Sequence, residues 1–329
     1  MSDKTSTMNY PKLFIVGCPR SGTSWVTSLV ASHPTVVAVP IETHAYPLVY
    51  EPFARLSEQE FAARLKSWKG ILRRYGPKPL LRGFHSSDIW RGILRTYQIM
   101  NKENSHGLRL LVDYDELSQL IETAQRCPGV DLDRAEQVIA EMFDRFFQKH
   151  GQAGQMLLEK TPLHIRYGDR ILQRFPEAKV IEVIRDGRDV CVSYAALAQQ
   201  HKWAKVGTAG AISQWKQCIE RGQRLRENPA FSARMHSVRY ESLKVAPEAE
   251  LQQIFEFAQL PTATQQIRDF VHAASIEQVA IKGEGQYVRK GAVGDWKNRL
   301  SDEDVKMCDA IAGKQLRQLG YSSSEYLLP

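Results

Sequence analysis

The stretch FIVGCPRSGTSW at residues 14–25 decides the fold. An apolar run ends at Gly17, a turn with Pro19 and Gly22 follows, and the next residues through Ala31 suit a helix. A strand, loop and helix in this order present main-chain N–H groups and hydroxyls at a helix N-terminus, where the helix dipole favours an anion. The stretch therefore predicts a loop that binds phosphate or sulfate.

The same loop departs from the nucleotide P-loop at one position. Gly17 to Ser24 has the spacing of that motif, but Thr23 stands where the motif has Lys. The cation lies at Arg20, inside the loop. This arrangement favours a phosphate- or sulfate-bearing ligand other than ATP with magnesium.

Composition is that of an ordinary globular protein, with 329 residues of which 43% are hydrophobic and 25% charged. No apolar run approaches the roughly 18 residues of a membrane span, and residues 1–10 are polar without an apolar signal core. We expect a cytoplasmic chain without a membrane anchor. The net charge of +7 suits an acidic small ligand, and no basic tract with interleaved aromatics predicts nucleic-acid binding.

Five cysteines are scattered along the chain, and none form a CxxC pair. Neither a disulfide framework nor a metal site is expected from this pattern. Cys18 lies in the anion loop, where a packed thiol is the favoured interpretation and a reactive one the alternative.

Short β-rich runs alternate with helical patterns, which predicts a single α/β domain over residues 1–329 with a central, mostly parallel sheet and helices on both faces. The expected strands are Leu13–Val16, Val36–Val39, Met156–Leu158, Val180–Ile184 and Ser237–Tyr240. The expected helices are Asp133–Lys149, His164–Arg174, Val190–Gln199, Ile212–Arg226, Glu248–Gln259 and Asp302–Leu319. Residues 52–129 have no clear strand and read as a helical insertion, either contacting an acceptor substrate or serving only as a packed cap.

Polar residues follow four of the expected strands, and ligands of open parallel sheets bind beyond the carboxyl ends of the strands. We therefore expect a functional edge there. The four segments are residues 20–25, 40–44, 159–162 and 185–189, the last followed by Ser193 in a helix.

Arg185 and Ser193 could grip one phosphate from two sides. Alternatively, Arg185 pairs with Asp189 and Ser193 is a surface hydroxyl. A third segment, residues 287–298, has adjacent cations at Arg289 and Lys290 beside glycines. It suits a mobile loop that closes on an anion, or an exposed basic turn.

These three segments in order resemble the sulfotransferases that use 3′-phosphoadenosine 5′-phosphosulfate (PAPS). Residues 18–25 look like the 5′-phosphosulfate loop of that family, residues 180–194 like its 3′-phosphate segment, and residues 289–298 like the late glycine motif of its cytosolic branch. The resemblance implies a P-loop-like three-layer α/β fold, PAPS as co-substrate, its bisphosphate PAP as product, and no metal.

The resemblance also implies roles for individual residues. The 5′-phosphosulfate would be held by Arg20, Ser21, Gly22, Thr23 and Ser24, and the 3′-phosphate by Arg185, Ser193, Arg289, Lys290 and Gly291. Trp25 and Tyr240 would lie beside the adenine, although either could simply be a packed aromatic.

The catalytic residues show mixed features of two branches. The cytosolic branch places a catalytic His soon after a Lys-Thr pair, and here His164 follows Lys160 and Thr161. The tyrosylprotein branch uses a Glu after the second strand, which Glu42 matches.

We expect Glu42 to be the general base, with His44 and His164 as alternatives. A non-catalytic His164 would face solvent in the first turn of a helix. Arg20, Lys160 and the helix N-terminus at Gly22 would stabilise the bridging oxygen as it gains charge.

The expected reaction is sulfuryl transfer to a hydroxyl or amine of a small-molecule acceptor, and a homodimer is possible. Two other functions stay open. One is a P-loop nucleotide kinase, which the absence of Lys at residue 23 disfavours. The other is a non-catalytic nucleotide-binding protein of the same fold.

Overall fold

The computed structural model describes residues 10–57, 68–78, 85–103, 107–128, 130–275 and 291–321. The chain divides into two compact units. The large unit consists of Lys12–Val36 and Pro162–Pro329, and the small unit of Met1–Pro11 and Val37–Thr161.

The strands of the described residues form one five-stranded sheet in the order β2-β3-β1-β4-β5. Within the large unit β4 is parallel to both of its neighbours: Phe14 of β1 pairs with Val180, and Val180 with Met235 of β5. Such a sheet confirms the expected parallel α/β class. The strands are β1 (Lys12–Gly17), β2 (Val36–Ala38), β3 (Met156–Lys160), β4 (Lys179–Ile184) and β5 (Met235–Arg239).

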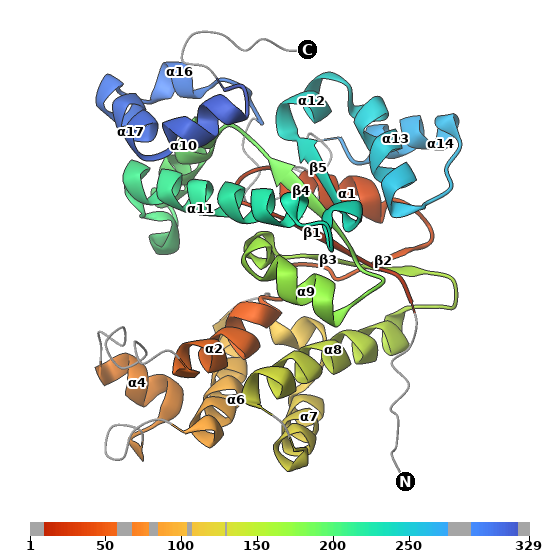
Figure 1. Cartoon of the computed structure of the whole chain (residues 1–329), viewed down its shortest axis with the longest axis vertical. Helices are drawn as coiled ribbons and strands as arrows, with labels where there is room; N and C mark the ends of the chain where they lie inside the picture. Colours follow the sequence, from red (N-terminus) through yellow and green to blue (C-terminus); the bar gives the residue numbers. More distant parts are fainter. Residues whose placement is uncertain are drawn as a thin grey trace. The chain divides into compact units, whose positions relative to one another are not determined.

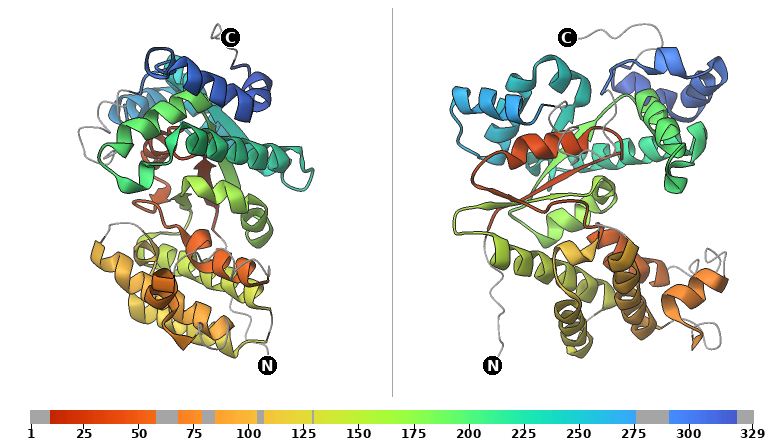
Figure 2. Two further views of the ribbon diagram at one scale, coloured as in Figure 1. Left: turned by 90° about the vertical axis from the view of Figure 1, so that its left-hand side faces the viewer. Right: turned by 180° about the vertical axis from the view of Figure 1, so that it is seen from behind.

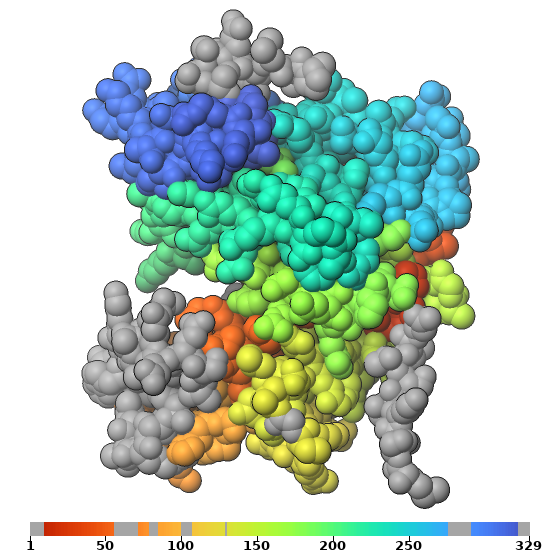
Figure 3. Space-filling model, in the orientation of Figure 1, coloured from red at the N-terminus to blue at the C-terminus, as the bar shows by residue number. Residues whose placement is uncertain are grey.

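Helices cover both faces of the large unit's strands. Helix α11 lies over one face, and α1 lies over the other, as the front and rear views show (Figures 1 and 2). Helix α17 packs against α11 and the two share one outer surface (Figure 3). The helices of this unit are α1 (Thr23–Ala31), α9 (Gly168–Arg174), α10 (Gly187–Ala198), α11 (Gly207–Glu227), α12 (Tyr240–Val245), α13 (Pro247–Ala258), α14 (Thr264–Ala273), α16 (Trp296–Arg299) and α17 (Asp302–Gln318).

The small unit is mainly helical. Helix α8 buries the apolar stripe that its sequence predicts, including Phe143 and Phe146, so these residues form core. The described part of residues 52–129 consists of helices, a 3₁₀ turn at Leu108–Leu110 and loops. The helices of this unit are α2 (Glu51–Ser57), α4 (Trp68–Tyr75), α6 (Ser86–Glu103), α7 (Tyr114–Arg126) and α8 (Asp131–His150), and a π-helical turn at Tyr46–Tyr50 precedes α2.

Two sequence expectations about the region after residue 155 need correction. Strand β3 continues to Lys160, so Glu159 and Lys160 belong to the strand instead of following it. The expected helix at His164–Arg174 begins only at Gly168, and Pro162–Tyr167 is a 3₁₀ turn. His164 is fully buried because this turn packs against β1, and the solvent-facing interpretation of its side chain is therefore wrong.

Among the described residues, none of the helices combines the length and the apolar character that crossing a membrane requires.

Candidate active site

The anion loop turns sharply before α1. Gly22 caps the helix with φ +96°, a left-handed conformation that favours glycine. A Cβ atom at this position would lie 2.4 Å from Cδ2 of Tyr240, which is too close for any side chain. Both the left-handed backbone and the nearby Tyr240 ring therefore require glycine at position 22. The first N–H groups of α1, which have no partner within the helix, follow this turn.

Two side chains of the loop have features typical of a ligand site. Arg20 adopts a left-handed backbone with φ +77°, a conformation that costs a residue with a side chain about 1–2 kcal/mol. Its Nε donates a hydrogen bond to Oγ of Ser193, 3.1 Å away. Ser21 is 1% exposed, and within the described residues its hydroxyl has no hydrogen-bond partner. A buried unpaired hydroxyl is costly, so this one fits an anion's oxygen.

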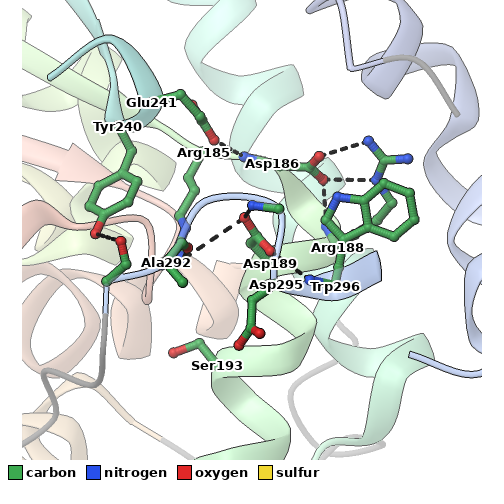
Figure 4. A network of polar contacts seen from close by, with 12 residues as sticks. Arg185, Asp186, Arg188, Asp189, Ser193, Tyr240, Glu241, Ala292, Asp295 and Trp296 are labelled. Carbon is green, nitrogen blue, oxygen red and sulfur yellow. Dashed lines mark hydrogen bonds and ion pairs between the residues drawn. The ribbon is translucent and has the colours of Figure 1, made fainter. Parts of the chain in front are cut away.

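Arg185 directly follows β4 and contacts Ala292 of the late segment (Figure 4), and it also reaches the anion loop. Its Nη1 donates to the main-chain oxygen of Arg20 at 3.2 Å, and its Nη2 donates to that of Ala292 at 2.7 Å. The guanidinium lies 4.4 Å from the ring centroid of Tyr240. Asp189 is more distant, at 4.0 Å. The interpretation of Arg185 as only a partner of Asp189 therefore fails.

Ser193 is also not a surface hydroxyl. Its residue is 8% exposed, and it lies in α10 as the acceptor of the Arg20 hydrogen bond. The structure thus brings the first two predicted phosphate-binding segments together through Arg20, Arg185 and Ser193.

Asp189 holds the third segment, a role that the sequence did not reveal. Its carboxylate accepts hydrogen bonds from the N–H groups of Gly294, at 2.8 Å, and Trp296, at 3.0 Å. Burial raises the pKa of Asp189, and the nearby Arg185 and these two amides oppose that shift. Gly291 lies in this segment, and its main-chain oxygen accepts from the Tyr240 hydroxyl at 3.0 Å. Arg289 and Lys290 lie outside the described residues.

A second buried network fixes the turn after β4 (Figure 4). Asp186 caps α10, and its carboxylate binds the guanidinium of Arg188, which stacks 3.7 Å from the centroid of the Trp296 ring. The carboxylate of Glu241 accepts from the Asp186 N–H at 2.9 Å and from the Tyr321 hydroxyl at 3.0 Å. These contacts hold the turn that directly follows Arg185.

Trp25 and Tyr240 pack edge to face, with ring centroids 5.8 Å apart. Trp25 donates from Nε1 to the main-chain oxygen of Ala274, and both rings are buried. Both rings lie beside the anion loop, which is compatible with the adenine-flanking roles that the resemblance implies. Their contact with adenine stays a prediction.

The small unit contains Glu42, the carboxylate that the sequence predicts as the general base. Nζ of Lys160 donates to Oε1 of Glu42 at 2.8 Å, and Nε2 of His44 lies 3.4 Å from Oε2 of Glu42. The side chains of Glu42 and His44 are 28% and 29% exposed, so both can reach solvent or a substrate. His44 itself has a left-handed backbone, with φ +50°. The structure thus joins three of the predicted catalytic residues.

Gly107 supports this cluster and was missed in the sequence. Its N–H donates to the main-chain oxygen of Glu42 at 3.0 Å, and its φ of +105° favours glycine. A lone glycine in an unassigned region gave no signal of this contact. His164 belongs to the large unit, and its buried imidazole stays only a candidate base.

The parallel α/β fold, the anion loop with Arg20, and Arg185 at the end of β4 define a P-loop-like protein that is suited to phosphate or sulfate. The chain belongs to the sulfotransferase family, whose sequence model matches residues 11–264.

The chain is similar to two curated proteins, of which one is named as a sulfotransferase. A protein-tyrosine sulfotransferase of Drosophila melanogaster is 26% identical over 140 residues, which are 40% of this chain and 27% of the relative. An uncharacterized protein of Aquifex aeolicus is 23% identical over 295 residues, 87% of this chain and 30% of the relative. The matched regions thus span less than a third of these curated relatives.

A solved structure shares the fold. The sulfotransferase domain of the olefin synthase of Synechococcus PCC 7002 superposes with a TM-score of 0.51 at 16% identity, covering 92% of this chain and 94% of that domain.

Proposed function

We propose that this protein transfers a sulfuryl group from PAPS to a hydroxyl or amine of a small metabolite. One observation carries the proposal: Arg185 donates to the main chain of the Arg20 loop, so that two segments with phosphate-binding character meet. Membership of the sulfotransferase family supports the same reaction.

The large unit supplies the groups that would bind the donor. The unpartnered hydroxyl of Ser21 and the first amides of α1 suit a phosphosulfate group. Arg185 now donates to neutral carbonyl oxygens, and a phosphate is a stronger acceptor because its hydrogen bonds with a guanidinium are charge-assisted. The proposed 5′ ligands are Arg20, Ser21, Gly22, Thr23 and Ser24, and the proposed 3′ ligands are Arg185, Ser193, Arg289, Lys290 and Gly291.

The small unit supplies the proposed base. The acceptor oxygen forms a bond to sulfur while the bond between sulfur and the bridging oxygen of the donor breaks. The electron pair of the broken bond stays on the bisphosphate, and the acceptor's proton passes to Glu42. Nζ of Lys160 lies 2.8 Å from Oε1 of Glu42. Arg20 and Lys160 are the cations proposed to balance the charge that develops on the leaving group.

The acceptor site is proposed to involve residues 52–129, because Gly107 of that region holds the main chain of Glu42. A cytoplasmic location stays a prediction. A homodimer stays a prediction.

The test is transfer of labelled sulfate from PAPS to a panel of phenols, alcohols and amines. Wild-type protein should label at least one acceptor, and Glu42→Gln should lower kcat about 10²–10⁴-fold. His44→Ala and His164→Ala, assayed beside it, distinguish the candidate bases. Near-wild-type activity of Glu42→Gln would remove Glu42 from this role.

Ligand-dependent melting separates the other functions. PAP should raise the melting temperature more than ATP with magnesium does, whereas a P-loop kinase would show the reverse. Stabilisation by PAP without transfer to any acceptor would indicate a binding protein of the same fold.

A further inference from the structure

The segment Thr43–Ala45 is tied to one buried carboxylate in the small unit. Glu159 is 0% exposed. Its Oε1 accepts hydrogen bonds from the hydroxyl of Thr43 at 2.8 Å and from the hydroxyl of Thr161 at 2.6 Å. Burying a carboxyl group this deeply is costly unless hydrogen bonds satisfy it, and here the partners are the hydroxyls of Thr161 and of Thr43, the residue after Glu42.

The direction of each hydrogen bond follows from the chemistry. Both threonine hydroxyls donate to Oε1 of Glu159, because a carboxyl oxygen without a proton can only accept. The lone pairs of Thr161 Oγ1 are then left for the N–H groups of Thr43, at 3.1 Å, and His44, at 3.3 Å. Thr43 Oγ1 in turn accepts from the N–H of Ala45 at 3.3 Å. Glu159 thereby orients the two threonine hydroxyl oxygens that accept hydrogen bonds from the main-chain N–H groups of residues 43–45.

These bonds fix the residues on both sides of Thr43. His44 has the strained φ of +50°, which persists only where the surroundings impose it. Glu42 directly precedes the tied segment, and Lys160, between Glu159 and Thr161, binds its carboxylate. The consecutive residues 159–161 thus bind both the main chain after Glu42 and the side chain of Glu42 itself.

We propose that Glu159 is a positioning residue, which acts through the hydroxyls of Thr161 and Thr43 to hold Glu42 and His44 in their reactive orientation. This inference rests on the proposed function, in which Glu42 removes the acceptor's proton. Glu159 itself touches neither substrate nor donor in this role. Its effect should therefore appear in kcat and leave donor binding unchanged.

The test compares Thr161→Val with Thr161→Ser. Valine has nearly the shape of threonine without the hydroxyl, whereas serine keeps the hydroxyl. Since a misplacement of about 1 Å can cost on the order of 10²-fold in rate, we expect Thr161→Val to lower kcat about 10–100-fold and Thr161→Ser to stay within about 3-fold of wild type. The Kd of PAP should be the same in all three proteins.

Glu159 is tested in the same way. The amide oxygen of Glu159→Gln can still accept from both hydroxyls, so this variant should keep most of the activity, and Glu159→Leu should lose it. Equal losses in Thr161→Val and Thr161→Ser, or wild-type kcat in Thr161→Val, would overturn the proposal.

Hydrogen exchange gives a readout that needs no activity. The Thr43 and His44 amides should be protected in wild type and in Thr161→Ser, and should exchange faster in Thr161→Val. Wild-type protein that transfers no sulfate would refute the proposed function, while this exchange pattern would still show whether the carboxylate holds the segment. Unchanged exchange in a folded Thr161→Val would refute the positioning role, and if that variant does not fold, Thr43→Val and Thr43→Ser give the same comparison at Ala45.

Discussion

Arg185 donates a hydrogen bond from Nη1 to the main-chain oxygen of Arg20, 3.2 Å away, across 165 positions of the chain. The same guanidinium binds the main-chain oxygen of Ala292. One side chain at the end of β4 therefore connects the anion loop with the late segment. Both of these hydrogen bonds end on neutral main-chain oxygens, and the carboxylate of Asp189 lies farther away, at 4.0 Å.

Arg185→Met should remove the discrimination between PAP and 5′-AMP. The loss of one hydrogen bond from a charged group, worth about 1.5–3 kcal/mol, should weaken PAP binding about 10–100-fold. Binding of 5′-AMP, which lacks the 3′-phosphate, should change little. Isothermal titration with both nucleotides measures the difference.

Arg224→Met is the matched control, because Arg224 is an exposed residue of α11 that bonds within its own helix. It should bind both nucleotides as wild type does. Equal weakening of PAP and 5′-AMP in Arg185→Met would argue against a 3′-phosphate contact.

Gly22→Ala should abolish PAP binding at measurable concentrations. The added Cβ would meet Tyr240 at 2.4 Å in a left-handed backbone, so the loop and the aromatic ring must both shift. Gly207→Ala is a fair comparison, because Gly207 also has a left-handed φ, +66°, but open space around its Cβ position. Gly207→Ala should lose only about 1 kcal/mol of stability and bind PAP normally, and the idea fails if the two variants bind alike.

Glu241→Gln should change how stability depends on pH. Burial raises the pKa of Glu241 above the ordinary value of 4.5, despite the N–H of Asp186 and the hydroxyl of Tyr321. The folded chain then binds this proton more tightly than the unfolded chain, so the group's contribution to the free energy of unfolding falls as pH rises from 4.5 to the raised pKa.

Denaturant unfolding of wild type and Glu241→Gln between pH 4.5 and 7 measures this contribution as the difference between the two curves. The variant should lose less stability over that interval than wild type does. Parallel curves would show that Glu241 does not titrate in this range.

Cys18 should resist alkylation in the folded protein although it lies in the anion loop. It is 1% exposed, and burial raises the pKa of its thiol, so little thiolate is present near pH 8. Cys127, which is half-buried, should react with iodoacetamide first. Peptide mass spectrometry locates the label, with Cys127→Ser as the control, and rapid labelling of Cys18 would contradict the packed-thiol interpretation.

Local patterns predicted much of the fold. The apolar runs at Leu13–Val16 and Val180–Ile184 lie within strands, because buried parallel strands are continuous in their hydrophobicity. The main errors lie between Met156 and Arg174. Strand β3 is longer than its apolar part, since Glu159 can be buried with two threonine hydroxyls that only the folded chain brings to it.

The residues of the candidate site also fall into a group that the sequence predicted and a group that it did not. Arg20, Arg185 and Glu42 stood out in the sequence because each follows a predicted strand. Gly107 did not stand out, and the partners of Asp189 and Glu159, which lay in the predicted strand-end segments, did not follow from the sequence. Each of the three contacts main-chain or side-chain groups far away in the chain. No local periodicity carries information about such contacts.

The sequence by itself determined the elements and the chemical character of this protein: a parallel α/β chain, an anion loop with arginine for lysine, and cations at the strand ends. These follow from short-range preferences of backbone and side chains, which a few neighbouring residues decide. Only the tertiary structure decided that Arg185 reaches Arg20 and that Glu159 reaches Thr43 in the segment after Glu42. Such hydrogen bonds depend on distances of a few ångströms between residues more than a hundred positions apart, and packing of the whole unit sets those distances.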